Sequence, residues 1–421
     1  MDARALPPRP SLEQYRKQAK ELLHAARSGE PESVRRMRQC PRVRDPAMPD
    51  QRDAYALADA QRVVAREHGF ESWPGFASHV EALAYRDAPV ARFEAAADAI
   101  VAGDEATLHE LLRDHPALVR ARSTRAHHAT LLHYVAANGV EDFRQRTPDN
   151  ALAIARMLID AGADVDAVAD SYGGGSHQTT LNLLVSSVHP ARANLQAPLV
   201  ELLLDAGAAI EGLDGDGSPL LTSLAFQYPD AAEALARRGA RVHTVLAAAG
   251  LGREDLVRRF VDASGHAIAD GPLASVRWLR LPRDPQAHLE RALIWAAALG
   301  RTAMVEFLSM QHVNLGATDD QGLTAMHWAA VQGHQDVLDV LLSRRAPMEA
   351  RNVYGGTVLG AAVWASTHVD GVFRPGGFAP ADHVAIIERL IAAGARIDAV
   401  GYPSGNRVVD AVLERHGARV S

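Results

Sequence analysis

The feature that most constrains this chain is a pattern that returns after 33 residues. Within residues 319–351, the hydroxyl of Thr324 is placed to cap the first free N–H groups of a helix, and Gly333 can end that helix in the left-handed region. A second helix is expected directly afterwards, with one apolar face formed by Val337, Leu338, Leu341 and Leu342. Neither short helix can bury its apolar face alone. The pattern therefore predicts a stack of helix pairs, each pair covering the next.

The opening of this pattern occurs again at residues 354–359, and related openings occur at residues 130–139 and 179–190. The recurring signature is T-x-L-H or a variant of it, then A-A, G-H and V-x-x-L-L. This signature resembles the ankyrin repeat family. The resemblance implies an all-α ankyrin-repeat solenoid of about ten helix pairs, with short β-hairpin or loop tips and degenerate caps. Pairing a helical front with such repeats is also similar to many bacterial ankyrin proteins.

Composition narrows the class of function. The 421 residues are 48% hydrophobic and carry a net charge of −7, without a basic stripe that would grip the phosphates of nucleic acid. No apolar run is long enough to cross a membrane, and the first ten residues lack the apolar core of a signal peptide. Cys40 is the only cysteine, which excludes an intrachain disulfide. We expect a cytoplasmic protein that binds neither nucleic acid nor membrane.

The positions at which proline and glycine interrupt the pattern predict the domain organisation. Proline-rich residues at the front predict an extended lead-in, and the prolines around residue 275 predict an irregular interruption. The predicted segments are a lead-in at 1–10, a helical N-terminal cap of degenerate repeats at 11–85, ankyrin repeats with inserted loops at 90–261, an irregular insert at 262–287, and repeats with a C-terminal cap at 288–421.

The histidines of the T-x-L-H signature, His133 and His327, have a structural role by the ankyrin resemblance. The ring is expected to hydrogen-bond near the threonine of its own repeat and so steady the hairpin. Trp295 and Trp328 are 33 residues apart and are interpreted mainly as packing residues at equivalent positions. Trp364 falls three residues later in its helix, where the resemblance implies a position facing the concave groove.

Two hairpin tips are unusual because both contain Tyr-Gly-Gly, at residues 172–174 and 354–356. Glycines let the backbone adopt positive φ and let another chain approach, while a tyrosine offers a flat ring and a hydroxyl. The repeats that carry these tips also carry inserted loops. We expect a protein or peptide partner to bind the concave side. The predicted contact residues are Tyr172, Asn138, Ser186, Phe226, Gln332, Trp328, Tyr354 and Trp364.

An enzyme is the alternative. The Tyr-Gly-Gly loops and the inserts between helices could cover a pocket in each of the two repeats that carry them, and acid–base catalysis could take place in that pocket. The residues available for this role are Tyr172, His177, His189, Tyr354, His368 and Asp370. The sequence contains no metalloprotease, serine-hydrolase or nucleotide-binding motif in a suitable context. We therefore expect no cofactor and no metal, and we favour recognition over catalysis.

Overall fold

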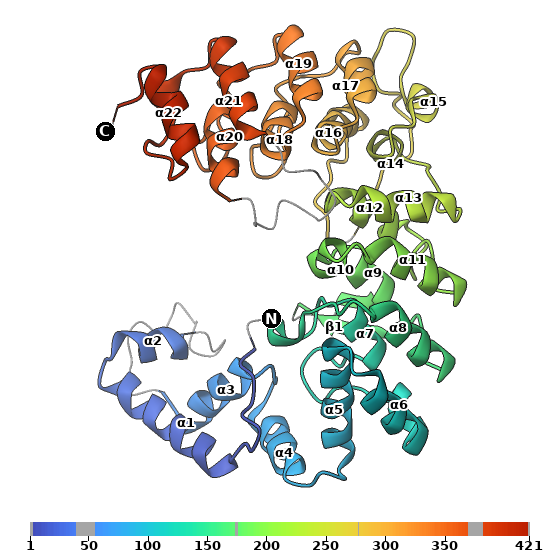
Figure 1. Ribbon diagram of the computed structural model, residues 1–421, viewed down its shortest axis with the longest axis vertical. Coiled ribbons are helices and arrows are strands. Elements are labelled where there is room, and N and C mark those ends of the chain that lie inside the picture. Colours follow the sequence, from blue (N-terminus) through green and yellow to red (C-terminus); the bar gives the residue numbers. More distant parts are fainter. Residues whose placement is uncertain (1–2, 39–54, 173–175, 277, 369–381, 420–421) are drawn as a thin grey trace. The chain divides into compact units, whose positions relative to one another are not determined.

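The computed structural model describes residues 3–38, 55–172, 176–276, 278–368 and 382–419 (Figure 1). Contacts between residues divide the chain into two compact units, which we call the N unit (residues 1–208) and the C unit (residues 209–421). The predicted block 90–261 contains this division, which the sequence pattern did not indicate. The two units are described separately.

The N unit is built almost entirely from helices. Its elements, in chain order, are α1 (Leu12–Arg27), α2 (Pro31–Met37), α3 (Leu57–Glu67), α4 (Trp73–Leu83), α5 (Pro89–Ala102), α6 (Glu105–Asp114), η3 (Pro116–Arg120), α7 (Leu131–Val135), η4 (Asp142–Arg144), α8 (Ala151–Asp160), β1 (Val168–Ser171), β2 (Ser176–Thr179), α9 (Thr180–Leu184), α10 (Val188–Arg192) and α11 (Gln196–Asp205). The two strands pair antiparallel, with Val168 opposite Thr179.

The named elements of the C unit are all α-helices or short 3₁₀ helices, the latter labelled η. These are α12 (Ser218–Ala225), α13 (Pro229–Arg237), α14 (Val245–Gly250), α15 (Glu254–Val257), η5 (Arg258–Phe260), α16 (Pro285–Ala298), α17 (Thr302–Ser309), α18 (Ala325–Gln332), α19 (Gln335–Ser343), α20 (Val358–Thr367), α21 (His383–Ala392), η6 (Ile397–Ala399) and α22 (Arg407–Arg415).

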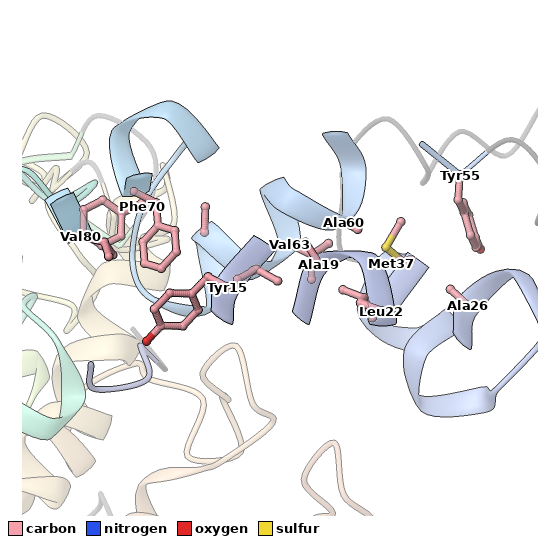
Figure 2. Close-up of a cluster of buried hydrophobic side chains, with 13 residues drawn as sticks. Tyr15, Ala19, Leu22, Ala26, Met37, Tyr55, Ala60, Val63, Phe70 and Val80 are labelled. Carbon is pink, nitrogen blue, oxygen red and sulfur yellow. The ribbon is translucent and has the colours of Figure 1, made fainter. Parts of the chain in front are cut away.

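Helices α1–α4 share a buried apolar cluster (Figure 2). Tyr15, Ala19 and Leu22 lie three or four residues apart on α1, so they form one face of that helix. The ring of Tyr15 meets that of Phe76 edge-on, with the ring centres 4.9 Å apart. The hydroxyl of Ser72 caps α4 by accepting a hydrogen bond from the N–H of Gly75. The first four helices therefore have an apolar core of their own.

The repeat at residues 319–351 has the local structure that its sequence predicts. Thr324 caps α18, and Gly333 ends it with a φ of 79°. Helix α19 follows from Gln335, and Leu338 and Leu341 are fully buried on one of its faces. Leu338 and Leu341 therefore pack between repeats as expected, whereas Leu342, which the pattern places on the same face, is only partly buried.

The first helices of successive repeats form a row in the C unit, α14, α16, α18 and α20, each packed against the next (Figure 1). The second helices α17 and α19 pack against each other as well. Among the described residues, the only sheet is the β1–β2 hairpin. The prediction of an all-α repeat solenoid is confirmed.

The segment between η5 and α16 forms no helix in its described residues, 262–276 and 278–284. Its backbone makes two isolated bridges, Val261 with Ala267 and Val276 with Leu279. Helix α16 begins at Pro285, where Asp284 caps it by accepting a hydrogen bond of 2.8 Å from the N–H of Ala287. The final three residues of the predicted insert, 285–287, are thus helical.

Candidate functional site

The histidine of α18 connects one repeat to the next hairpin tip. Nδ1 of His327 accepts a hydrogen bond from the N–H of Thr324, at 3.2 Å. The other ring nitrogen, Nε2, therefore carries the proton and faces the carbonyl of Gly356 at 3.4 Å. Burial lowers the pKa of His327, which keeps the ring neutral. The structural role expected for this histidine is seen, and it fixes where the following tip lies.

His133 makes the corresponding connection in the N unit. Its Nδ1 accepts from the N–H of Thr130 at 3.1 Å, and its Nε2 lies 3.3 Å from the carbonyl of Gln178 in strand β2. Burial lowers the pKa of His133 to about 4. Both signature histidines thus join their own repeat to the tip of the next one.

The tip at Tyr354 is held by the side chains of Asn352 and Arg351, which bond to its backbone and do not involve the tyrosine ring. The side-chain oxygen of Asn352 accepts hydrogen bonds of 3.0 Å from the N–H groups of Tyr354 and Gly356. The guanidinium of Arg351 donates to the carbonyl of Gly355 at 2.7 Å, and Gly355 has a φ of 80°. Tyr354 is 80% exposed. The predicted exposure of this ring is confirmed.

Tyr354 stands beside a hollow of about 430 Å³ on the faces of α18 and α20. Trp328 and Val331 come from α18, and Ala361 and Trp364 come from α20. The ring of Trp364 is half-exposed, whereas Val331 and Ala361 are buried against each other in a small apolar cluster. The structure therefore brings together three predicted contact residues, Trp328, Tyr354 and Trp364. Trp328 is itself buried, at 9% exposed, as the interpretation of it as a packing residue expects.

A second hollow, of about 270 Å³, lies on the other side of Trp328. Its apolar wall includes Phe226 and Trp295, and Asp319 is one of its polar residues. The indole N–H of Trp328 donates to a carboxylate oxygen of Asp319 at 2.7 Å, which fixes the ring between the two hollows. We call the two hollows together the aromatic groove, defined by Phe226, Trp295, Trp328, Tyr354 and Trp364.

One predicted contact residue of the C unit does not belong to this surface. Gln332 is only 3% exposed, and its side-chain amide is hydrogen-bonded to that of Gln227. The prediction placed Gln332 on an exposed helix face, but its side chain meets Gln227, which follows α12 in the sequence. A buried amide with a partner supports the packing of the repeats, so Gln332 cannot contact a partner without rearrangement.

Three predicted contact residues of the N unit form a connected group. The hydroxyl of Tyr172 donates to the side-chain oxygen of Asn138. The amide nitrogen of Asn138 donates to Oγ of Ser186 at 2.9 Å and to the carbonyl of Leu183 at 3.1 Å. The ring of Tyr172 is 59% exposed, while partial burial raises the pKa of its hydroxyl. The predicted exposure of this second tyrosine is also confirmed.

The residues proposed for acid–base catalysis are not assembled by the described part of the chain, where no two of them are hydrogen-bonded to each other. The ring of His368 stacks on Trp364, with centres 4.4 Å apart. His189 lies in α10, and burial lowers its pKa. The side chain of His177 and the whole of Asp370 lie outside the described residues.

The comparison with protein families identifies the repeats. A model of ankyrin repeats in three copies matches residues 246–352 and 293–372, which lie in the C unit and include α14 to α20. Residues 246–372 of the chain are therefore ankyrin repeats. No curated protein matches the chain. A bacterial origin and a separate N-terminal cap stay predictions.

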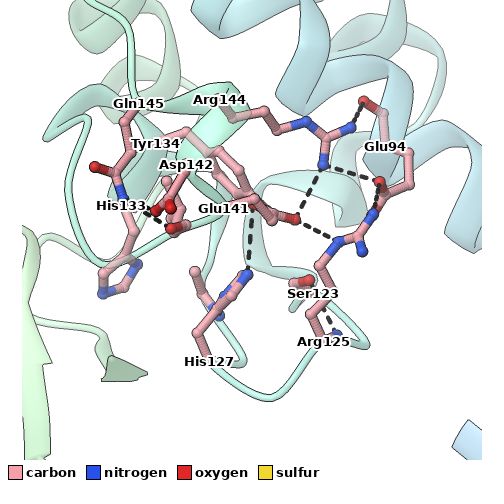
Figure 3. Close-up of polar contacts among 12 residues, drawn as sticks. Glu94, Ser123, Arg125, His127, His133, Tyr134, Glu141, Asp142, Arg144 and Gln145 are labelled. Atoms are coloured by element: carbon pink, nitrogen blue, oxygen red, sulfur yellow. Dashed lines mark hydrogen bonds and ion pairs between the residues drawn. The ribbon is translucent and has the colours of Figure 1, made fainter. Parts of the chain in front are cut away.

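The N unit contains a buried ionic cluster that the sequence did not suggest (Figure 3). A carboxylate oxygen of Glu94 in α5 lies 2.9 Å from the guanidinium of Arg125 and 2.8 Å from that of Arg144. Glu141 is ion-paired with both arginines as well. Arg144 extends further to Asp98 at 2.7 Å. Two carboxylates and two guanidiniums therefore neutralise one another inside the protein.

Neighbouring groups complete this ionic cluster. The Arg125 guanidinium donates to the carbonyl of His68 at 2.8 Å, and the Tyr134 hydroxyl donates to Glu141 at 3.4 Å. Burial alone would raise the pKa of Glu94, but the two guanidiniums hold it below its ordinary value. Burial would likewise raise the pKa of Glu141, but the neighbouring His127 ring and the two guanidiniums lower it. The cluster connects the end of α3 to α5, α7 and η4.

Neither a metal centre nor a membrane span is found in the described part of the chain. The described residues bring together no group of three or more histidine, cysteine, aspartate or glutamate side chains suited to a metal ion. Among the helices that the structure describes, none is long and apolar enough to cross a membrane.

Proposed function

We propose that the C unit binds a protein or peptide partner in the aromatic groove. The observation that carries this proposal is the position of Trp328, which lines two adjacent hollows with aromatic side chains on both sides. Aromatic side chains in partly enclosed pockets are the residues that contribute most to binding at protein interfaces. The hollows are lined mainly by apolar groups with a few polar ones at the rim, as the centre of an interface is.

The construction of the groove supports the same proposal. Tyr354 is mostly exposed, yet the hydrogen bonds of Asn352 and Arg351 fix the backbone beneath it. Trp328 is held by Asp319. Side chains that are already positioned lose little conformational freedom when a partner binds, so more of the contact energy appears as affinity.

A peptide selection tests the proposal even while the natural partner is unidentified. Random peptides displayed on phage would be selected on the full chain, and individual binders measured by fluorescence anisotropy. Binders are expected to lose affinity by tenfold or more with Tyr354→Ala or Trp364→Ala, roughly the effect of truncating a central contact residue. Tyr85→Ala serves as the matched control, because Tyr85 is also an exposed tyrosine but lies outside the groove.

Two outcomes would refute the proposal. One is a selection that yields no binders above background. The other is a set of binders whose affinity is unchanged by both groove variants, which would place recognition elsewhere on the chain.

We extend the proposal to the tip of the N unit, where Tyr172, Asn138 and Ser186 would contact the same or another partner. The exposed ring of Tyr172 and its hydrogen bond to Asn138 support this extension. We also infer a cytoplasmic location, because a single cysteine suits a reducing compartment.

A further inference from the structure

One end of the aromatic groove, at Phe226, already carries a piece of the chain itself. The indole N–H of Trp278 donates to Oγ1 of Thr222 in α12 at 3.3 Å, and its ring lies 5.3 Å from that of Phe226. Leu279 lines the smaller hollow together with Phe226. Residues of the irregular segment therefore pack beside α12, where this end of the groove accepts an aromatic ring and an apolar side chain.

The two hollows are spaced to take consecutive turns of an extended peptide. They lie on either side of Trp328, and adjacent packed helices are about 8–10 Å apart. In the polyproline II conformation the chain rises about 3.1 Å per residue with three residues per turn, so side chains three residues apart share a face at about 9 Å. Two apolar side chains with this separation can enter the two hollows together.

The smaller hollow is lined by two carboxylates and by the guanidinium of Arg291. Gln321 lines both hollows, and Asp319 and Asp320 immediately precede it in the smaller one. Asp320 is paired with Arg291 at 3.2 Å, but its side chain is 54% exposed, whereas that of Arg291 is 11% exposed. Solvent and an incoming peptide therefore meet the carboxylate of Asp320 more than the guanidinium of Arg291.

We propose that the aromatic groove binds an extended peptide in which two large apolar side chains, three residues apart, flank an arginine or lysine. The apolar pair enters the two hollows, and the cation lies against Asp320 at the rim. This inference rests on the proposed function and specifies the chemistry of its partner. The internal segment has the same chemistry, because Trp278 and Leu281 are three residues apart with Arg280 between them.

The probe is a fluorescein-labelled peptide with the sequence of residues 275–283, Ser-Val-Arg-Trp-Leu-Arg-Leu-Pro-Arg, titrated into the full chain. The matched peptide carries glutamate in place of the three arginines. The basic peptide is expected to bind at least tenfold more tightly than the acidic one, because like charges at a contact are unfavourable. A third peptide, with alanine for tryptophan and both leucines, should not bind measurably.

Variants of the protein locate the cation. Asp320→Asn should lower the affinity for the basic peptide by about three- to fivefold and reduce the salt dependence of its binding. Glu306→Gln removes an exposed charge on α17, away from the groove, and should leave the affinity unchanged. Melting temperatures of both variants verify that they fold.

The outcomes separate this inference from the proposed function. Equal binding of the basic and acidic peptides, or an unchanged affinity with Asp320→Asn, overturns the partner chemistry. If the phage selection still yields binders that depend on Tyr354, the groove binds peptides of another class and the proposed function stands. If neither the basic peptide nor any selected peptide depends on Tyr354 or Trp364, both conclusions fail.

Discussion

The buried ionic cluster of the N unit yields the sharpest stability prediction. Glu141 is 1% exposed and is paired with Arg125 and Arg144, which are also buried. Glu141→Gln keeps the size and shape of the side chain but removes its negative charge. The two guanidiniums are then left with Glu94 inside the protein and with Asp98 at its surface.

The size of the effect follows from this loss of neutralisation. Removing one partner from a buried ion pair costs about 3–5 kcal/mol, because the remaining charge stays out of water without compensation. Glu94 and Asp98 still offset part of the positive charge, so we expect about 3 kcal/mol, the lower end of that range. Asp114→Asn breaks an exposed pair with Arg113 and is the control, for which we expect no measurable change.

Urea unfolding with hydrogen exchange measured by mass spectrometry provides the assay. In a repeat protein each element is stabilised mainly by its neighbours, so amides of α3, α5 and α7 should lose protection first. Helices α16 to α20 should keep theirs. A Glu141→Gln protein with a free energy of unfolding within about 1 kcal/mol of the parent would refute the reasoning, since that is the scale of ordinary surface changes.

Three more predictions concern pH, packing and the hairpin tips. The N unit should lose stability as the pH falls from about 6.5 to 4. Burial lowers the pKa values of His79 and His133 to about 4, while histidine in the unfolded chain titrates near 6.5, so the unfolded state binds protons first. A melting temperature that is constant over this range would contradict this prediction. Leu341→Ala should cost about 2–5 kcal/mol, because the side chain is fully buried, and exchange should increase first in α18 to α20; uniform loosening of the whole chain would argue against local coupling. Tyr354→Ala and Tyr172→Ala should each leave the free energy of unfolding within about 1 kcal/mol, since both rings are exposed, and a drop of many degrees in melting temperature would assign the rings a structural role.

The repeats could be predicted because their signals are local. The cap at Thr324, the left-handed end at Gly333 and the apolar spacing of α19 all lie within one period of the pattern. The ring of His327 also has the role that its position implies. Exposure of a hairpin tip is similarly local, which is why the exposure of Tyr354 and Tyr172 could be predicted.

Other features depend on contacts between residues far apart in the sequence. Glu94 lies in an alanine-rich helix and Arg125 in a polar loop, and neither setting indicates that the two charges meet inside the protein. Gln332 has the sequence environment of an exposed helix end, yet it meets Gln227, 105 residues earlier. Trp278 lies in a segment without periodicity, so nothing local indicated that its ring would reach α12.

The link from His327 to the carbonyl of Gly356 has a consequence for how such a protein can change over generations. The acceptor is a backbone atom, so the bond survives whatever side chains the next tip carries. A duplicated or exchanged repeat therefore keeps its attachment, and the residues at its tip can diverge without loosening the array. Tyr354 occupies such a position, two residues before the carbonyl that His327 contacts. Ligand preference can thus be altered at the tips while the architecture that holds them is inherited intact.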